Sequence, residues 1–99
     1  MQGLAHYEGT TTTTITGAGQ AGGGFKLAGW VVTETAGAAA TVNFRDGASG
    51  PIVAQVRIPA ASASPTVRMG PANSYINLLS GNLQIEVVSG AVQWAAYRA

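Results

Sequence analysis

The chain has 99 residues and no cysteine, with 46% hydrophobic residues, only 9% charged residues and a net charge of +1 at pH 7. Without cysteine there are no disulfides, thiolate metal ligands or thiol nucleophiles, and the five scattered cationic side chains form no basic patch for nucleic acid. No run approaches the ~18 apolar residues of a membrane span, and the start of the chain lacks a signal-peptide pattern, so we expect neither a membrane nor a nucleic-acid partner.

Residues 1–24 are predicted to form an extended N-terminal arm and a Gly-rich connector. Within them, residues 10–16 are a further strand candidate, because they contain five consecutive threonines whose branched side chains favour extended structure. Residues 17–24 have glycine at five of eight positions, which is typical of a flexible connector. They include a GxGxxG match, but a dinucleotide-binding loop must follow a strand and open a helix. Here a strand pattern follows, so we interpret the match as linker.

Residues 25–34 form the first strong strand pattern, and its phase changes in the middle. Phe25 and Leu27 share one face, whereas Trp30 and Val32 have the opposite parity. One extra residue at Ala28-Gly29 brings both pairs to the same side of a sheet, because a β-bulge places two residues opposite one. The sequence therefore predicts a bulge at this point.

Six more strand patterns follow, and four of them suggest two hairpins. Residues 42–45 alternate in polarity, residues 46–50 provide a turn, and residues 52–58 alternate again between two prolines. Two shorter strands are predicted around residues 67–69 and 76–78. Residues 83–88 and 92–97 alternate on either side of Ser89-Gly90, which predicts a C-terminal hairpin.

About eight short strands with turns between them predict an all-β fold. We expect a two-sheet antiparallel sandwich over residues 25–99, with jelly-roll or other Greek-key topology, and an N-terminal arm outside it. The predicted core consists of the inward-facing apolar residues of these strands: Phe25, Leu27, Trp30, Val32, Val42, Phe44, Ile52, Val56, Ile58, Val67, Met69, Ile76, Leu78, Leu83, Ile85, Val87, Val92 and Trp94.

The polar residues predict no catalytic, cofactor or metal site. His6 is the only histidine, so no His-His or Cys-His metal cluster can form within one chain, and a site shared around a symmetry axis stays open. A glycosidase needs a carboxylate pair across a cleft, but Asp46 is better explained as a turn residue. Glu86 is expected to point outward and face Arg57 or Arg68 across the sheet. No serine lies in a G-x-S-x-G elbow, so no hydrolase is predicted.

The sheet edges suggest assembly. An open sandwich has edge strands that invite pairing, and monomers protect them with lysine, glutamate or proline. This chain has a single lysine, Lys26. We therefore expect another subunit to cover at least one edge or face. Both tryptophans are assigned to the core by parity, whereas Tyr75 and Tyr97 are candidate surface contacts.

The segment VNFRDGASGPIVA at residues 42–54 resembles small structural proteins from the virion gene modules of tailed bacteriophages. The resemblance extends over residues 25–97 and includes the later segments at residues 58–60, 79–83 and 88–92. It implies a non-enzymatic β-sandwich of the capsid decoration, or cement, type, with no cofactor. Such a protein is made in the host cytoplasm and binds the major capsid protein on the virion surface as a homo-oligomer, often a trimer.

The resemblance also implies that the arm contacts the shell, with Leu4, His6, Tyr7 and Ile15 as the contacting residues. An arm of this kind becomes ordered only on the assembled particle. The alternative function is a tail or fibre-associated module that binds a host surface glycan through Tyr75 and Tyr97. A small carbohydrate-active enzyme is the third class, and it requires a carboxylate pair that we do not expect.

Overall fold

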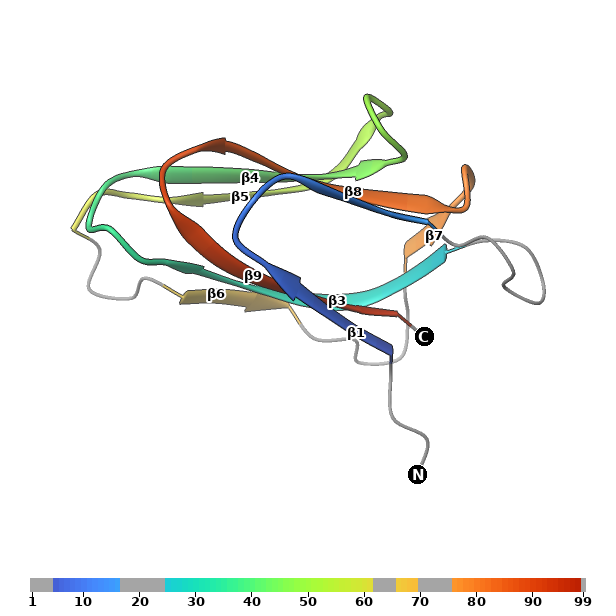
Figure 1. The fold of residues 1–99 in the computed structure, drawn as a ribbon, viewed down its shortest axis with the longest axis horizontal. Coiled ribbons are helices and arrows are strands. Elements are labelled where there is room, and N and C mark those ends of the chain that lie inside the picture. Colours follow the sequence, from blue (N-terminus) through green and yellow to red (C-terminus); the bar gives the residue numbers. More distant parts are fainter. Residues whose placement is uncertain (1–4, 17–24, 62–65, 70–75, 99) are drawn as a thin grey trace.

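The computed structural model describes residues 5–16, 25–61, 66–69 and 76–98, which form two antiparallel sheets packed face to face (Figure 1). Sheet A has the strand order β1 (Ala5–Gly9), β9 (Val92–Arg98), β3 (Phe25–Glu34) and β6 (Thr66–Met69), and β7 (Ile76–Leu78) also pairs with β3. Sheet B has the order β2 (Thr13–Thr16), β8 (Asn82–Ser89), β4 (Ala40–Asp46) and β5 (Ile52–Ile58). The predicted class, a two-sheet antiparallel sandwich, is confirmed.

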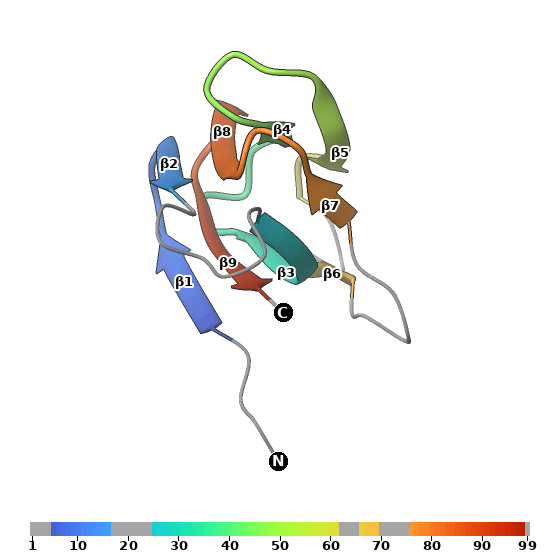
Figure 2. The same cartoon turned by 90° about the vertical axis from the view of Figure 1, so that its right-hand side faces the viewer.

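The strand order is that of a jelly roll. Antiparallel pairs are nested along the chain: β1 pairs with β9, β2 with β8, β3 with β6, and β4 with β5. The chain is thus one long hairpin with its tip at the β4–β5 turn, rolled up so that β1 to β4 alternate between the sheets. Figure 2 shows β1 and β2 on one side of the sandwich and β5, β6 and β7 on the other.

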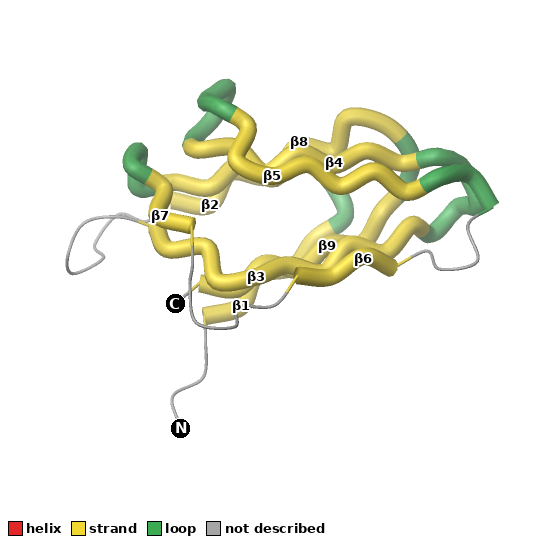
Figure 3. The backbone as a smooth tube through the Cα atoms, turned by 180° about the vertical axis from the view of Figure 1, so that it is seen from behind, coloured by secondary structure: helices red, strands yellow, loops and turns green. Residues whose placement is uncertain are grey.

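Figure 3 shows the two sheets as separate layers, and the buried apolar side chains of both sheets form one core cluster. The rings of Trp30 and Phe44 stack between the sheets with centroids 4.8 Å apart. The buried members of the predicted core are Leu27, Trp30, Val32, Val42, Phe44, Val56, Ile58, Leu78, Leu83, Ile85, Val92 and Trp94. Ile76 and Val87 are partly buried against this cluster. The prediction did not include Ile15, Ala28, Ala40 and Ala96, which are also buried.

The predicted bulge in β3 is confirmed. The pairing of β3 with β9 shifts register between Leu27 and Gly29, and Leu27 and Trp30 are both buried despite their opposite parity. The β4–β5 hairpin is also present, with antiparallel pairing from Ala40 opposite Ile58 onward. Alternation along one strand was therefore sufficient to find the bulge, and two alternating strands with a turn between them were sufficient to find the hairpin.

The predicted C-terminal hairpin is wrong. β8 lies in sheet B between β2 and β4, whereas β9 lies in sheet A between β1 and β3. The chain crosses from one sheet to the other at Gly90, where φ is +79°. A Cβ atom at this position would lie 2.5 Å from the carbonyl oxygen of Ala39, so the crossing depends on glycine.

Two residues assigned to the core are exposed. Ile52 is 46% exposed and Val67 is 37% exposed. A second bulge explains Ile52, because the β4–β5 register shifts between Phe44 and Arg45 and places Ile52 opposite Arg45 on the outer face. Val67 is paired with buried Val32 but lies on the edge strand β6. The side chains of Phe25 and Met69 lie outside the described part of the structure.

The N-terminal segment that was expected to form a separate arm contributes to both sheets. β1 pairs with β9 along its whole length, and β2 pairs with β8. The turn between them carries the chain from sheet A to sheet B, so residues 5–16 form one side of the sandwich (Figure 2). The domain therefore includes residues well before the predicted boundary at residue 25. The predicted connector, residues 17–24, lies outside the described residues.

Candidate functional site

The residues expected to contact a shell do not form one exposed group. Ile15 is only 9% exposed and belongs to the core, so it is not a surface contact. Tyr7 faces inward and packs against the same core, with the Arg98 guanidinium 5.8 Å from its ring centroid. His6 pairs with Tyr97 in the register, but its side chain is not described. Leu4 and Tyr75 lie outside the described residues.

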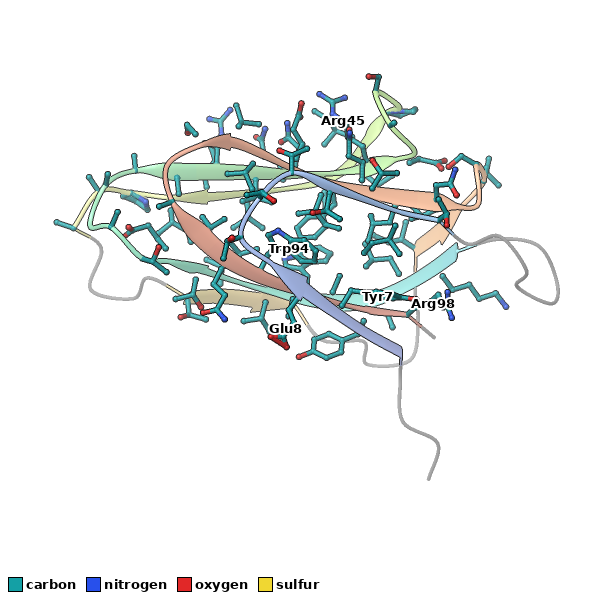
Figure 4. The ribbon with its side chains drawn as sticks, in the orientation of Figure 1. Tyr7, Glu8, Arg45, Trp94 and Arg98 are labelled. Carbon is teal, nitrogen blue, oxygen red and sulfur yellow. The ribbon has the colours of Figure 1, made fainter. Side chains whose placement is uncertain are left out.

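Trp94 connects the start of the chain to the core. Its indole Nε1 donates a 3.0 Å hydrogen bond to the carbonyl oxygen of Thr11, in the turn between β1 and β2. Gly9 lies directly opposite Trp94 in the register. A Cβ atom on Gly9 would be 2.7 Å from the Trp94 ring, so the glycine allows β1 to pack closely over the indole. Figure 4 shows Trp94 between the two sheets.

The outer face of sheet A contains a shallow hollow of about 380 Å³. We call it the sheet A hollow. It opens on the side of the sheet opposite the core, and Figure 4 shows Glu8 pointing away from the core on that side. The residues that line it come from three adjacent strands: Glu8, Val31, Thr33, Gln93, Trp94, Ala95 and Tyr97.

The register of sheet A explains the shape of the hollow. Glu8, Ala95 and Val31 lie in one row across β1, β9 and β3. Tyr97 lies opposite Gly29 in the row on one side. Gln93 lies opposite Thr33 in the row on the other side. The small side chain of Ala95 is thus surrounded by longer ones, and this difference in height creates the hollow.

The polar groups of the hollow differ in chemistry. Glu8 and Gln93 are exposed at its rim, whereas Thr33 and Tyr97 are half-buried. The hydroxyl oxygens of Thr33 and Thr66 are 3.0 Å apart and share a hydrogen bond. A carboxylate, an amide, a hydroxyl and a phenol therefore surround a small apolar floor. This set can bind a ligand through hydrogen bonds and ring stacking, but it contains no nucleophile with an adjacent base.

The outer face of sheet B carries a network of polar side chains that bond to one another. Gln55 Nε2 donates to Asn43 Oδ1 at 2.8 Å, and Asn43 Nδ2 donates to Glu86 Oε1 at 3.0 Å. Arg45 Nε forms a 2.9 Å ion pair with Glu86 Oε1, while Arg45 Nη1 donates to the carbonyl oxygen of Gly50 at 2.7 Å. The hydrogen bond from Asn43 and the Arg45 charge lower the pKa of the Glu86 carboxyl.

The predicted partners of Glu86 were wrong, although its outward orientation was right. Glu86 pairs with Asn43 in the β4–β8 register, so its ionic partner is Arg45 on β4. Arg57 lies on β5, one strand further away, and Arg68 lies in the other sheet. The sequence pattern gave the correct face but not the neighbouring strand.

Two other carboxylates stabilise turns. Asp46 accepts hydrogen bonds from the backbone N–H groups of Leu79 and Ser80, at 3.1 and 2.9 Å. Bonds from the Ser80 side chain and these backbone groups lower the pKa of Asp46. Glu34, which is buried, accepts bonds from the backbone N–H groups of Ala36 and Ala38. The prediction that Asp46 is a turn residue is confirmed, and these two carboxylates are occupied structurally.

Sheet B has two edge strands, β2 and β5, and each pairs on one side only within the described residues. β5 is the last strand of its sheet and pairs only with β4 among the described strands. Its only charged residue is Arg57. β6 lies at the edge of sheet A on the same side of the sandwich (Figure 2). Exposed Ile52 and Val67 belong to these two strands. We call β5 and β6 together the open side.

Neither a metal cluster nor a membrane helix is found in the described part of the chain. No three acidic, histidine or cysteine side chains of these residues come together as metal ligands. No helix there is long and apolar enough to cross a bilayer. In comparisons with known proteins, no family model, no curated protein and no solved structure matches the chain. The fold thus defines a jelly-roll protein, and any function must be argued from its surfaces.

The sequence analysis identified only one residue of the sheet A hollow, Tyr97. It missed Glu8 because residues 1–24 were assigned to a separate arm. It also missed Val31 and Thr33, whose side chains alternate outward from β3. The available signal was the alternation of Gln93, Ala95 and Tyr97 on the outer face of β9. Only the long-range register brings the three strands together.

Proposed function

We propose that this protein is a non-enzymatic structural component of a tailed-bacteriophage virion, which decorates the capsid as a homo-oligomer. The observation that carries the assembly part is the open side: an unpaired edge strand with one charged residue, next to exposed Ile52 and Val67. The resemblance of residues 42–54 to phage virion proteins supports the capsid part. The jelly roll is also common among viral capsid domains, although a fold by itself does not determine a function.

The physical reason for assembly is that an edge strand leaves backbone hydrogen-bonding groups unpaired. An unpaired strand presents a row of N–H and C=O groups that can pair with another chain. Along β5 there is no lysine or glutamate to repel such a partner. Pairing β5 with the corresponding strand of a second copy yields a two-fold dimer. Pairing β5 with the opposite edge strand, β2, of the next copy is a head-to-tail contact. It forms a ring when the rotation between copies closes, and the proposed trimer is one such ring.

Tyr7 and Ile15 pack against or inside the core of the sandwich, so the proposed shell contact does not use these two residues. The proposed partner is still the major capsid protein on the outside of the shell. Decoration adds buried area across several shell subunits, and an oligomer binds with higher avidity than its single contacts. A surface with few charges suits this role because few ions must be desolvated on docking.

Light scattering coupled to size-exclusion chromatography tests the assembly. We expect the wild-type protein to be an oligomer at micromolar concentration, and the double variant Ile52→Lys, Val67→Lys to be a folded monomer, since lysine protects an edge. Val88→Lys is the matched control, because Val88 is 54% exposed but lies on β8, which is paired on both sides. A monomeric wild-type protein would refute the proposed assembly.

Co-sedimentation with phage shells that lack decoration tests the capsid part. The oligomer should sediment with the shells, and the monomeric double variant should bind them at least about tenfold more weakly, because avidity is lost. A wild-type oligomer that stays in the supernatant with shells of the phage that encodes it would overturn the capsid assignment while leaving the assembly intact.

A further inference from the structure

We propose that the sheet A hollow binds a neutral sugar, with a pyranose ring against Tyr97 and its hydroxyl groups bonded to Glu8, Gln93 and Thr33. The hollow is distinct from the open side on which the assembly depends, so this inference does not rest on the proposed function. It assigns a ligand-binding site to the outer face of β1, β9 and β3.

The lining chemistry matches a sugar. A pyranose has an apolar C–H face and a rim of hydroxyl groups that donate and accept hydrogen bonds. Tyr97 offers an aromatic surface for the apolar face. Glu8 offers carboxylate oxygens that accept hydrogen bonds, and Gln93 offers both a donor and an acceptor. These groups converge from β1 and β9 on the floor formed by Ala95 and Val31.

The size of the hollow limits the ligand. Small-molecule sites occupy about 300–1,000 Å³, and the hollow, at about 380 Å³, lies near the lower end. The hollow therefore accommodates one or two sugar rings, and a longer glycan chain does not fit inside it. Because the hollow is open on the outer face, the ring can belong to the end of a longer glycan that extends into solvent.

The charge selects a neutral sugar over an acidic one. Glu8 is the only charged residue that lines the hollow. A carboxylate at the rim repels the carboxylate of a sialic or uronic acid, and it binds the hydroxyl groups of a neutral ring through charge-assisted hydrogen bonds. Neutral hexoses and N-acetylhexosamines are thus the expected class.

A protein partner fits this hollow less well. The buried centre of a protein interface is formed by large apolar anchors. In the described part of the chain, the exposed large hydrophobic residues are Ile52, Val67, Leu79 and Val88, and none of them lines the hollow. Apart from Trp94, which is buried, the hollow combines one aromatic residue, Tyr97, with polar groups, which is the chemistry of a sugar contact.

The strands hold the hollow in a fixed shape. Its floor lies on β9 and β3, which are the two inner strands of sheet A. Beneath it, Trp94 is buried in the core and bonded to Thr11. A site on paired strands loses little conformational entropy on binding, so more of the contact energy appears as affinity for the ligand.

The test uses an array of immobilised neutral and sialylated glycans, followed by saturation-transfer NMR with methyl glycosides of glucose, galactose, mannose and N-acetylglucosamine. We expect the wild-type protein to bind at least one neutral glycan. Tyr97→Ala and Glu8→Gln should each weaken the binding by about tenfold or more. Ala95→Phe should abolish it by filling the hollow without removing any proposed contact.

The controls separate this inference from folding and from assembly. Gln84→Ala changes the outer face of sheet B and should bind like the wild type. Circular dichroism and the mass from light scattering should be unchanged in all variants, since none of them alters the open side. Binding that is absent for every neutral glycan, restricted to sialylated glycans, or retained in Ala95→Phe would overturn the proposal.

Discussion

The side chain of Ile15 tests whether the N-terminal segment belongs to the sandwich in solution. Ile15 lies on β2, opposite Leu83, and is only 9% exposed. Ile15→Ala removes three carbon atoms from the core. At about 0.8 kcal/mol for each buried carbon, the transfer term alone is about 2.4 kcal/mol. β2 is an edge strand and can relax into part of the space, so we expect a total loss of about 2–3 kcal/mol.

Urea denaturation followed by circular dichroism measures this loss at a fixed protein concentration. A domain of this size has a stability of about 5–15 kcal/mol, so the midpoint should fall clearly, and Tm should drop by roughly 10–20 °C. Thr14→Ala is the matched control, because Thr14 is the exposed neighbour on the same strand. Its effect should stay within about 0.5 kcal/mol.

The result that would refute this reasoning is a loss for Ile15→Ala as small as that for Thr14→Ala. β2 would then not cover the core in solution, and residues 1–16 would behave as the free arm that the sequence suggested. A truncation of residues 1–16 is a less direct test, because it removes both β1 and β2 and exposes Trp94 together with two strand edges.

Three further predictions follow from individual contacts. Gly90→Ala should lower the free energy of unfolding by more than about 2 kcal/mol in the same urea assay, because φ is +79° and the new Cβ meets the Ala39 backbone. Gly37→Ala should lower it by about 1 kcal/mol, because φ is +73° but no atom lies near the new Cβ. Trp94→Phe should destabilise the protein by about 1 kcal/mol more than Trp30→Phe in thermal unfolding. Trp94 loses a hydrogen bond, whereas the buried Nε1 of Trp30 has no hydrogen-bond partner among the residues that the structure describes. Because folding lowers the pKa of Asp46, the ionised carboxylate stabilises the folded protein above about pH 4. This stabilisation is lost as the pH falls through the pKa that Asp46 has in the folded protein. Asp46→Asn should therefore flatten the acid side of the stability–pH curve, and an unchanged curve would contradict this role.

The sequence predicted those parts of the fold that depend on a single strand or a single tight turn. The opposite parities of Leu27 and Trp30 located the β3 bulge before any partner strand was known. The turn at residues 46–50 predicted the β4–β5 hairpin, because its polar residues and glycines follow one alternating strand and precede another. In the jelly roll this turn is the tip of the long hairpin, where two successive strands stay in the same sheet.

The sequence could not predict where the chain changes sheets. Ser89-Gly90 has the composition of a hairpin turn, but a short turn also allows β9 to cross into sheet A. The deciding contact is between Gly90 and Ala39, which are far apart in the chain. For the same reason Glu86 was paired with the wrong arginine, because alternation determines the face of a strand but not its neighbours.

β1 was missed as a strand, and β2, which lies within the strand candidate at residues 10–16, was assigned to an arm outside the sandwich. The reason in both cases is a polar composition. β2 contains three threonines and a single apolar residue, Ile15, so it has no hydrophobic alternation to indicate a core face. β1 contributes Tyr7 and Gly9 to the inner side, and the glycine is required by the indole of Trp94. The sheet A hollow was missed as a consequence, since Glu8 comes from β1.

The two proposed surfaces can act together because they do not overlap. The open side uses the edge strands β5 and β6, whereas the hollow lies over β1, β9 and β3. Assembly through sheet edges leaves the outer face of sheet A uncovered, so each copy in an oligomer presents one hollow. Several weak sugar sites held at fixed spacing bind an array of glycans with much higher avidity than one site. The double variant Ile52→Lys, Val67→Lys should therefore lose the glycan-array signal but bind a free methyl glycoside with unchanged affinity. If the affinity for the free methyl glycoside falls as well, the two surfaces are coupled.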